Sequence, residues 1–253
     1  GVYTPTERLD DYNNFGNLLR NQGEDAAAVT YYRRALNLSV RTVGEEHPWA
    51  RRVRDNLYNT LIQRGRYEDA LALARTSLDI AATQYAPPHP AITDAYQQVG
   101  HLLDNMGRSV EAAPILRRTV EMQKEIYGPD HIQTQSARVR YALCLVERGR
   151  LAQAQRLLQA GSAALQQTPP DSTTVDLKRT KAILLVGQGA VYARQEAWSA
   201  ARTFLRRGYR LRRKQVGLRA PLPQRALRSL AEGAQQAGRP GQAAAYRDSL
   251  MAW

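Results

Sequence analysis

The sequence predicts an all-α fold that is built from about six helix-turn-helix repeats, and three observations lead to this prediction. A turn glycine recurs every 42 residues at Gly23, Gly65, Gly107 and Gly149. The next step is 47 residues long and reaches Glu196 in the same position, and a further 42 residues lead to Gly238. A histidine recurs with the same 42-residue step, at His47, His89 and His131. Apolar residues on both sides of each turn follow the i, i+3, i+4 spacing that is typical of helices. A fixed period of this length is the signature of a repeat architecture.

Each repeat is predicted to contain two helices that are joined at the turn glycine. In the third repeat the first helix carries its apolar face at Tyr96, Val99, Leu103 and Met106. The second helix carries its apolar face at Ala112, Ile115, Leu116, Val120 and Ile126. Gly107 lies between them, where the end of a helix often needs a left-handed residue.

The positions of the histidines in the connectors between repeats indicate a structural role and not a catalytic or metal-binding one. In the stretch YGPDH at residues 127–131, Gly128 ends one helix, Pro129 discourages its continuation, and His131 caps the next helix. Three histidines on successive connectors cannot reach one zinc ion, because zinc needs its nitrogen ligands within about 2.1 Å. We therefore expect capping histidines, no metal site and no cofactor.

The repeats are expected to form a single domain that covers residues 1–253. Their approximate bounds are 9–47, 48–89, 90–131, 132–170, 175–220 and 221–253. The longer 47-residue step coincides with the polar, proline-containing stretch QQTPPDSTT, which reads as an extended loop.

The order of residues within the repeats resembles the tetratricopeptide repeat. The third repeat shows it best, with Tyr96, Val99, Gly100, Leu103, Gly107, Ala112 and Leu116 in the positions of the motif. A small residue of the first helix recurs at Gly16, Gly100 and Gly189, and an aromatic residue after the turn recurs at Tyr67 and Trp198. The alanine of the motif recurs at Ala28, Ala70, Ala112, Ala154, Ala201 and Ala243. Two departures are Glu196, where glycine is usual, and Pro240, which stands in the aromatic position.

The 42-residue period is similar to the long-repeat branch found in kinesin light chains and in many bacterial regulatory proteins. This resemblance implies a right-handed superhelical solenoid with a concave inner face, which the first helix of each repeat lines. The resemblance also implies a protein-binding or scaffold function.

No motif in the sequence indicates an enzyme. The chain lacks a G-x-S-x-G elbow, a phosphate-binding glycine loop and an H-E-x-x-H pair. Its single cysteine, Cys144, lies in the apolar stretch YALCLVE and is expected to be a small buried helix residue. No apolar run is long enough to predict a transmembrane helix.

The inner face of the first helices is the expected peptide-binding groove. Its predicted residues are Asn13, Asn14, Asn17, Asp55, Asn56, Asn59, Gln97, Gln98, His101, Asp104 and Arg140. Amide side chains both donate and accept hydrogen bonds, which suits an extended peptide backbone. The alternative is a solvated concave face without a partner.

Charge is distributed unevenly along the chain. Residues 1–131 contain 15 basic and 17 acidic residues, whereas residues 132–253 contain 21 basic and 6 acidic residues. A basic patch is predicted at Arg206, Arg207, Arg210, Arg212, Arg213 and Lys214. Arginine forks suit carboxylates and phosphates, so we expect an acidic protein partner. Nucleic acid is disfavoured, because the run lacks the interleaved aromatic residues of single-strand binders. A solvated basic face remains an alternative.

A second hypothesis for function is a structural subunit that polymerises head to tail. The acidic-leaning first half and the basic second half are complementary, and a heterologous contact that does not close produces a filament or another homo-oligomer. The chain begins with Gly1 rather than methionine, which favours a processed or excised chain. We expect a cytoplasmic location by default, and an extracellular one for a processed filament subunit. A glycosylation sequon at Asn37 lies on an expected helix, so chance is its favoured explanation.

Overall fold

The computed structural model describes residues 5–167 and 175–216, together with residues 231, 234, 235, 238 and 243. Within these residues the chain forms ten α-helices and no β-strand, so the predicted all-α repeat fold is confirmed. The chain divides into two compact units, residues 1–107 and 108–253, and each is described by itself below. The single domain predicted from the sequence stays a prediction.

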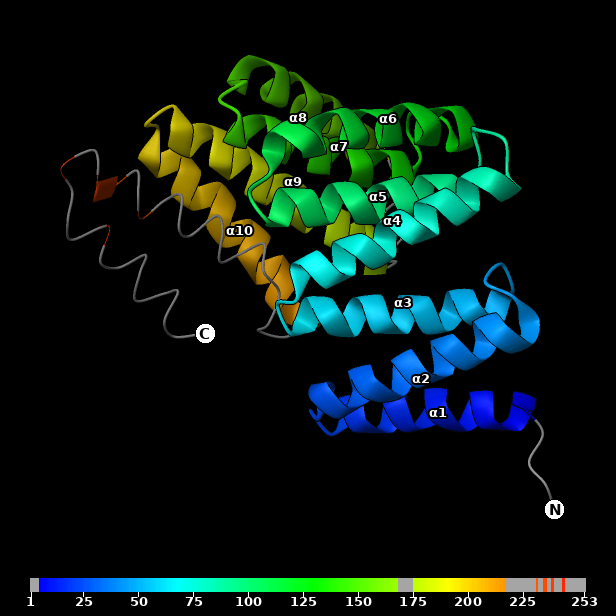
Figure 1. Cartoon of the computed structure of the whole chain (residues 1–253). Coiled ribbons are helices and arrows are strands. Elements are labelled where there is room, and N and C mark those ends of the chain that lie inside the picture. The colour runs from blue at the N-terminus through cyan, green and yellow to red at the C-terminus, as the bar shows by residue number, and fades with distance from the viewer. Residues whose placement is uncertain are drawn as a thin grey trace. The chain divides into compact units, whose positions relative to one another are not determined.

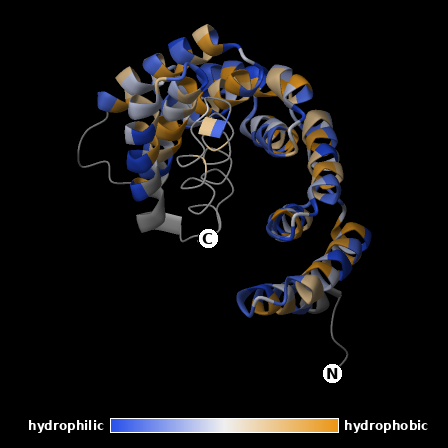
Figure 2. Cartoon of the chain, turned by 90° about the vertical axis from the view of Figure 1, so that its left-hand side faces the viewer, coloured by the Kyte–Doolittle hydropathy of each residue, from blue (hydrophilic) through white to orange (hydrophobic). Residues whose placement is uncertain are grey.

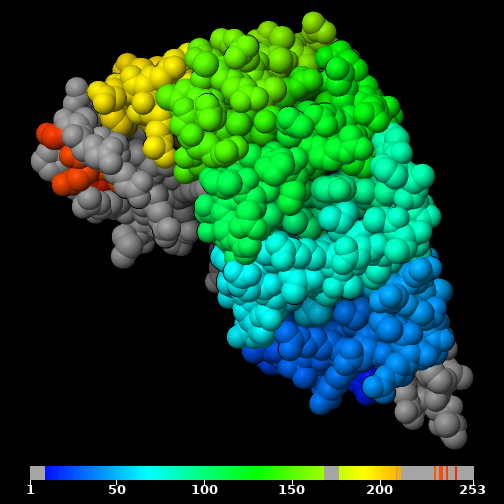
Figure 3. All heavy atoms as spheres, turned by 45° about the horizontal axis from the view of Figure 1, so that its top comes forward, coloured from blue at the N-terminus to red at the C-terminus, as the bar shows by residue number. Residues whose placement is uncertain are grey.

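The first unit contains five antiparallel helices. These are α1 (Pro5–Asn21), α2 (Asp25–Val43), α3 (Pro48–Gln63), α4 (Tyr67–Gln84) and α5 (Pro90–Asn105). Each helix packs against the next one in the chain, and α1 also touches α3 (Figure 1). In the space-filling view the residues of these helices follow one another in chain order, coloured from blue through cyan towards green (Figure 3).

The second unit contains the other five described helices. These are α6 (Ser109–Tyr127), α7 (Ile132–Glu147), α8 (Leu151–Gln166), α9 (Val175–Arg194) and α10 (Trp198–Val216). The first helices α7 and α9 of two successive pairs pack against each other, with α8 against both. Most of the predicted sixth repeat, residues 221–253, lies outside the described residues.

The turn glycines have the backbone conformation that the sequence predicts. Their φ angles are positive, at 82° for Gly23, 69° for Gly65, 77° for Gly107, 70° for Gly149 and 66° for Gly238. Glu196 occupies the same place in the fifth repeat with a φ of 61°, although glutamate pays a steric penalty there. The geometry of the turn therefore overrides the preference of the residue.

Small residues let the two helices of a repeat approach closely. All six alanines of the motif are completely buried: Ala28, Ala70, Ala112, Ala154, Ala201 and Ala243. A methyl group added to Gly16 would lie 2.6 Å from the Tyr32 ring, and one added to Gly189 would lie 2.5 Å from Leu205 Cγ. Larger side chains fill the space beside these small ones, as close packing requires. Figure 2 shows hydrophobic and hydrophilic residues interleaved along the helices.

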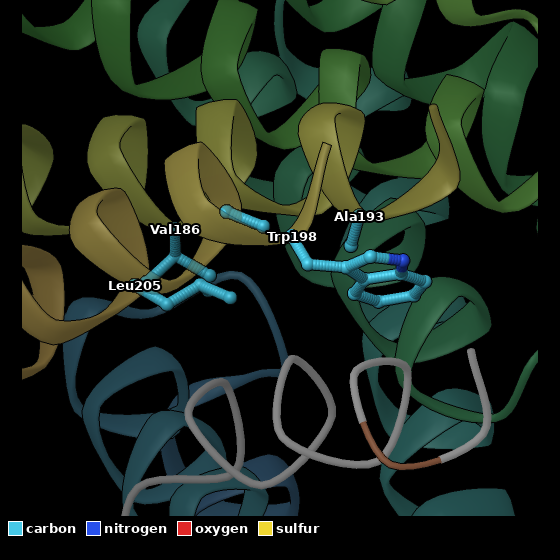
Figure 4. Close-up of a cluster of buried hydrophobic side chains, with 5 residues drawn as sticks. Val186, Ala193, Trp198 and Leu205 are labelled. Carbon is cyan, nitrogen blue, oxygen red and sulfur yellow. The ribbon is translucent and has the colours of Figure 1, made fainter. Parts of the chain in front are cut away.

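The aromatic position after the turn is part of the core. Trp198 is buried in a cluster with Val186, Ala193, Ala201 and Leu205 from α9 and α10 (Figure 4). Its indole ring lies beside Ala193, near the start of α10 (Figure 4). The prediction that Trp198 fills the packing position of the repeat is thereby confirmed.

The connector histidines cap helices, as predicted. The Nδ1 atom of His47 accepts a hydrogen bond from the Trp49 backbone N–H at 3.2 Å. The equivalent bonds of His89 and His131 reach the N–H groups two residues later at 3.2 and 3.3 Å. The rings also stack on tyrosines, His89 on Tyr85 and His131 on Tyr127.

The structure also shows the surroundings of Cys144 and of the sequon at Asn37. Cys144 is completely buried, as predicted, and its Sγ donates to the Ser109 carbonyl oxygen at 3.4 Å. Asn37 is exposed in α2, but Ser39 of the same sequon is completely buried and donates to the Leu36 carbonyl oxygen. Among the described residues, no helix is long and apolar enough to cross a membrane.

Candidate functional site

A pocket of about 540 Å³ opens in the first unit between the N-terminal halves of α3 and α5. The end of α4 and the connector that precedes α3 complete its walls. Its polar lining includes Arg51, Asp55, Asp94, Gln97 and Gln98. Its apolar lining includes Ile80, Ala81, Ala91 and Ala95, with Tyr85 from the end of α4. The pocket thus combines small apolar surfaces with convergent polar groups, which is typical of ligand sites.

Hydrogen bonds hold the polar wall of the pocket in place. The Gln98 side-chain amide donates to Asp55 Oδ1 at 3.4 Å, which joins α5 to α3. The Tyr58 hydroxyl donates to the Gln98 backbone carbonyl oxygen at 3.3 Å. The two first helices are therefore linked through the residues that line the pocket.

Two carboxyl groups of the pocket have raised pKa values. Burial raises the pKa of Asp55, while the hydrogen bond from Gln98 and the charges of Arg51 and Arg54 oppose this shift. Burial beside the pocket also raises the pKa of Asp94, where Arg51 opposes the shift and Asp55 adds to it. Asp94 nevertheless keeps much of its surface exposed to solvent. Arg51 is therefore the main positive charge that both carboxylates experience.

The connector side of the pocket is fixed by two other arginines. Arg54 is buried and donates to the Glu45 backbone carbonyl oxygen at 2.8 Å. Burial lowers the pKa of Arg54, although Asp55 and Glu45 favour its charged form. The guanidinium of Arg52 lies over the Trp49 ring, 4.6 Å from its centroid. These contacts order the segment through which α3 begins.

The structure brings three of the predicted groove residues, Asp55, Gln97 and Gln98, to this pocket. Other predicted groove residues contact the protein itself. The Asn56 amide donates to Asn13 Oδ1 at 3.0 Å, and the Tyr32 hydroxyl donates to Asn17 Oδ1 at 2.8 Å. These amides therefore serve at least in part to join helices.

The remaining groove residues have different surroundings. Asn14 and Asn59 are exposed, whereas Asp104 and Arg140 are buried. His101 is half-buried, and its Nε2 lies 3.2 Å from the Asn105 amide nitrogen. Arg140 belongs to the second unit and does not line the pocket, because all the lining residues belong to the first unit.

Sequence reasoning missed Arg51 and Asp94, and it missed the pattern of bonds between repeats. Asn13 pairs with Asn56, and Asp55 pairs with Gln98, so each pair is 43 residues apart. This separation is one residue more than the repeat. The adjacent polar pairs Asn13–Asn14, Asp55–Asn56 and Gln97–Gln98 carried that signal. Arg51 and Asp94 are also 43 residues apart, but they differ in residue type and so did not mark a repeated position.

The predicted basic patch lies on α10 in the second unit. Arg206, Arg207 and Arg210 are exposed. The side chains of Arg212, Arg213 and Lys214 lie outside the described residues. In the part of the chain that the structure describes, no group of three His, Cys, Asp or Glu side chains is placed to hold a metal ion.

Solved structures with the same fold share little sequence with this chain. The apo form of RapI has a TM-score of 0.76 and 15% identity, covering 99% of this chain and 84% of that one. The putative kinesin light chain TPR-like repeats of Podosopora anserina have a TM-score of 0.62 and 19% identity, covering 85% and 99%. A Rap protein complexed with Competence and Sporulation Factor has a TM-score of 0.66 and 13% identity, covering 99% and 76%. No curated protein matches the sequence.

The repeat pattern itself identifies the family. The family model described as tetratricopeptide repeat matches residues 12–83, 59–124 and 91–167, and these matches together span residues 12–167 of the 253. Helix pairs, turn glycines and buried alanines all lie where this repeat requires them. The chain therefore belongs to the tetratricopeptide repeat family.

Proposed function

We propose that this chain is a non-enzymatic protein-interaction module that binds an extended peptide segment of a partner in the pocket between α3 and α5. The observation that carries the proposal is the convergence of Arg51, Asp55, Asp94 and Gln97 on one pocket of about 540 Å³. Ligand pockets usually measure about 300–1,000 Å³. The pocket is therefore large enough for part of a peptide.

The lining of the pocket has the chemistry that an extended peptide needs. Gln97 has an amide that donates and accepts, so it can bind a backbone carbonyl or N–H group. Arg51 and Asp94 offer opposite charges, which would select the direction or side chains of the peptide. Ala91 and Ile80 leave room for a small apolar side chain between these polar groups.

A related structure supports the binding of a partner. The Rap protein that is complexed with Competence and Sporulation Factor shares the fold of this chain, with a TM-score of 0.66. Fold by itself does not fix function. For this reason the proposal rests on the pocket, and the related structure adds support to it.

This proposal assigns fewer of the predicted groove residues to the ligand. Asp94, Gln97 and Arg51 are assigned to the ligand, whereas Asn13, Asn17 and Asn56 are assigned chiefly to contacts between helices. Asn14, Asn59, His101, Asp104 and Arg140 stay predictions for the rest of the inner face. The acidic character of the partner is also a prediction.

A random decapeptide library provides the test. Peptides selected by the wild-type chain would be titrated against Gln97→Ala and Asp94→Ala, with Asn37→Ala on α2 as the exposed control outside the pocket and the predicted groove. We expect either pocket variant to weaken binding about tenfold or more, since each removes a polar contact to the ligand. The proposal fails if no peptide is enriched, or if the pocket variants bind as tightly as the Asn37→Ala control.

Head-to-tail assembly rests on the charge asymmetry of the sequence alone. None of the contacts described above and none of the related structures adds support to it. Light scattering over a salt series would test it, because screening shortens the reach of surface charges to about 8 Å at physiological ionic strength. A chain that stays monomeric at every salt concentration would exclude the filament.

A further inference from the structure

Exposed basic side chains lie on both helices of the α9–α10 pair in the second unit. Lys178 and Arg179 are exposed near the start of α9, and Arg206, Arg207 and Arg210 are exposed on α10. We call these five residues the α9–α10 basic surface. The sequence patch contained only residues of α10, and the fold adds the two from α9.

The close approach of the two helices fixes their register. A methyl group added to Gly208 would lie 2.9 Å from the Ala182 carbonyl oxygen and 3.1 Å from Leu185 Cβ. Lys178 lies one helical turn before Ala182, and Arg210 follows Gly208 by two residues. In this antiparallel pair Gly208 therefore lies level with the middle of α9, and Arg210 lies between this level and that of Lys178 along the pair.

The arginines of α10 point away from the core. Ala201, Leu205 and Gly208 form the buried stripe of this helix. Residues at 100° intervals around a helix place Arg206 and Arg210 on the opposite side from this stripe. Their side chains are exposed, so they are accessible to a partner.

These charges lack the compensation that other arginines of the same unit have. At the N-cap of α6, Arg108 Nε lies 2.7 Å from Glu111, and within α6 Arg117 Nε lies 3.3 Å from Glu121. Helix α10 has no acidic residue. Among the described residues, no carboxylate lies within ion-pair distance of the five cations. Arg206 and Arg210 are one turn apart, and like charges at this spacing repel each other.

We propose that the α9–α10 basic surface binds an acidic segment of a partner protein. Arginine forks bind carboxylates with two parallel hydrogen bonds, and an anion relieves the repulsion between Arg206 and Arg210. Nucleic acid is a poorer fit, because duplex binders commonly contact about 6–10 phosphates. The aromatic rings nearby, Tyr192 and Phe204, stack on each other with centroids 5.3 Å apart. This surface is independent of the pocket between α3 and α5, so either proposal can fail alone.

The test uses a fluorescent ten-residue polyglutamate peptide as the probe, with a ten-nucleotide oligothymidylate as the competing class. The variant Arg206→Gln, Arg207→Gln, Arg210→Gln removes three charges from the surface. The matched control, Arg117→Gln, Arg118→Gln, Arg156→Gln, removes three exposed charges elsewhere in the same unit. Circular dichroism of both variants checks that the helices are retained.

We expect polyglutamate to bind the wild-type chain at physiological salt and to bind the surface variant roughly tenfold more weakly. The control variant should lose less than threefold, and a second variant, Lys178→Gln with Arg179→Gln, should also weaken binding. Equal losses in the surface and control variants would overturn the proposal in favour of net charge alone. Tighter binding of the oligonucleotide than of polyglutamate would overturn it in favour of a nucleic-acid surface. If neither probe binds, the proposal is wrong.

Discussion

Glu196 shows at the level of one residue how a repeat imposes its geometry. It takes a φ of 61° at a turn where the equivalent residue in other repeats is glycine. A side chain with a Cβ is strained in this region by roughly 1–2 kcal/mol. Glycine relieves the strain, although it adds entropy to the unfolded chain.

Glu196→Gly is therefore expected to raise the free energy of unfolding by about 0.5–1 kcal/mol. Gly149→Ala, at the same turn of the preceding repeat, should lower it by about 1 kcal/mol, because its φ is 70°. Urea denaturation followed by circular dichroism measures both changes. A destabilised Glu196→Gly variant would show that the glutamate side chain stabilises the turn by other contacts.

Asp55 is a residue whose ionisation should oppose folding. Because burial raises its folded-state pKa above the unfolded value of about 3.9, the folded chain holds the proton more tightly than the unfolded chain. At about pH 3.5 and below, the carboxyl is mostly protonated in both states, so its ionisation has little effect on stability there. As pH rises through the folded-state pKa, ionisation lowers the stability of the wild-type chain.

Asp55→Asn should therefore match the wild type near pH 3.5 and become more stable than it as pH approaches 7. Thermal unfolding at a series of pH values measures this difference. Asp79→Asn, which removes an exposed carboxylate from α4, controls for the loss of one negative charge. A stability difference for Asp55→Asn that does not change with pH would contradict the prediction.

At the level of helices, the connectors between repeats determine where each pair begins. His131 caps α7 through a hydrogen bond of 3.3 Å to the Gln133 N–H, and its ring stacks on Tyr127 with centroids 4.9 Å apart. The cap satisfies a backbone donor that the helix itself leaves unpaired. Position and capping together explain why histidine recurs here without a metal or a reaction.

His131→Ala is expected to cost about 1 kcal/mol of stability, as the loss of an N-cap does. His131→Asn keeps a capping acceptor and loses the stacked ring, so it should recover most of this cost. Chemical denaturation of the two variants separates the cap from the stack. If both variants are destabilised equally, stacking on Tyr127 is the dominant contact.

At the level of the whole molecule, the same repeat position contributes differently to stability, depending on which helices pack against it. Leu18 of α1 and Leu102 of α5 are 84 residues apart and therefore occupy equivalent places. Leu102 is completely buried, in a helix against which α4 packs, whereas Leu18 is 50% exposed. In the described chain no helix precedes α1. Solenoid stability is close to a sum over nearest neighbours, so the neighbour decides the contribution.

Leu102→Ala is expected to lower the free energy of unfolding by about 2–5 kcal/mol, the cost of a cavity in a core. Leu18→Ala should cost about 1 kcal/mol or less, because half of its surface is already in water. The same denaturation experiment compares them directly. A cost for Leu18→Ala as large as that for Leu102→Ala would mean that another part of the protein covers α1.

The helical repeat, its turns and its packing positions follow from local sequence alone. These features depend on local rules: Gly107 permits a positive φ, His131 caps, and Ala112 allows close approach. They recur every 42 residues, so each copy reinforces the others. The buried alanines and the capping histidines could therefore be predicted residue by residue.

Which polar residues contact each other depends on how the helices pack. Asn13 meets Asn56, and Asp55 meets Gln98, because adjacent first helices are offset so that residues 43 apart, and not 42, face each other. The same offset leaves Asp94 and Gln97 in a pocket, and the close approach of Gly208 to Ala182 sets the register of α10 against α9. A local period places residues on a helix face, but the angle and offset between helices, which packing sets, determine their partners.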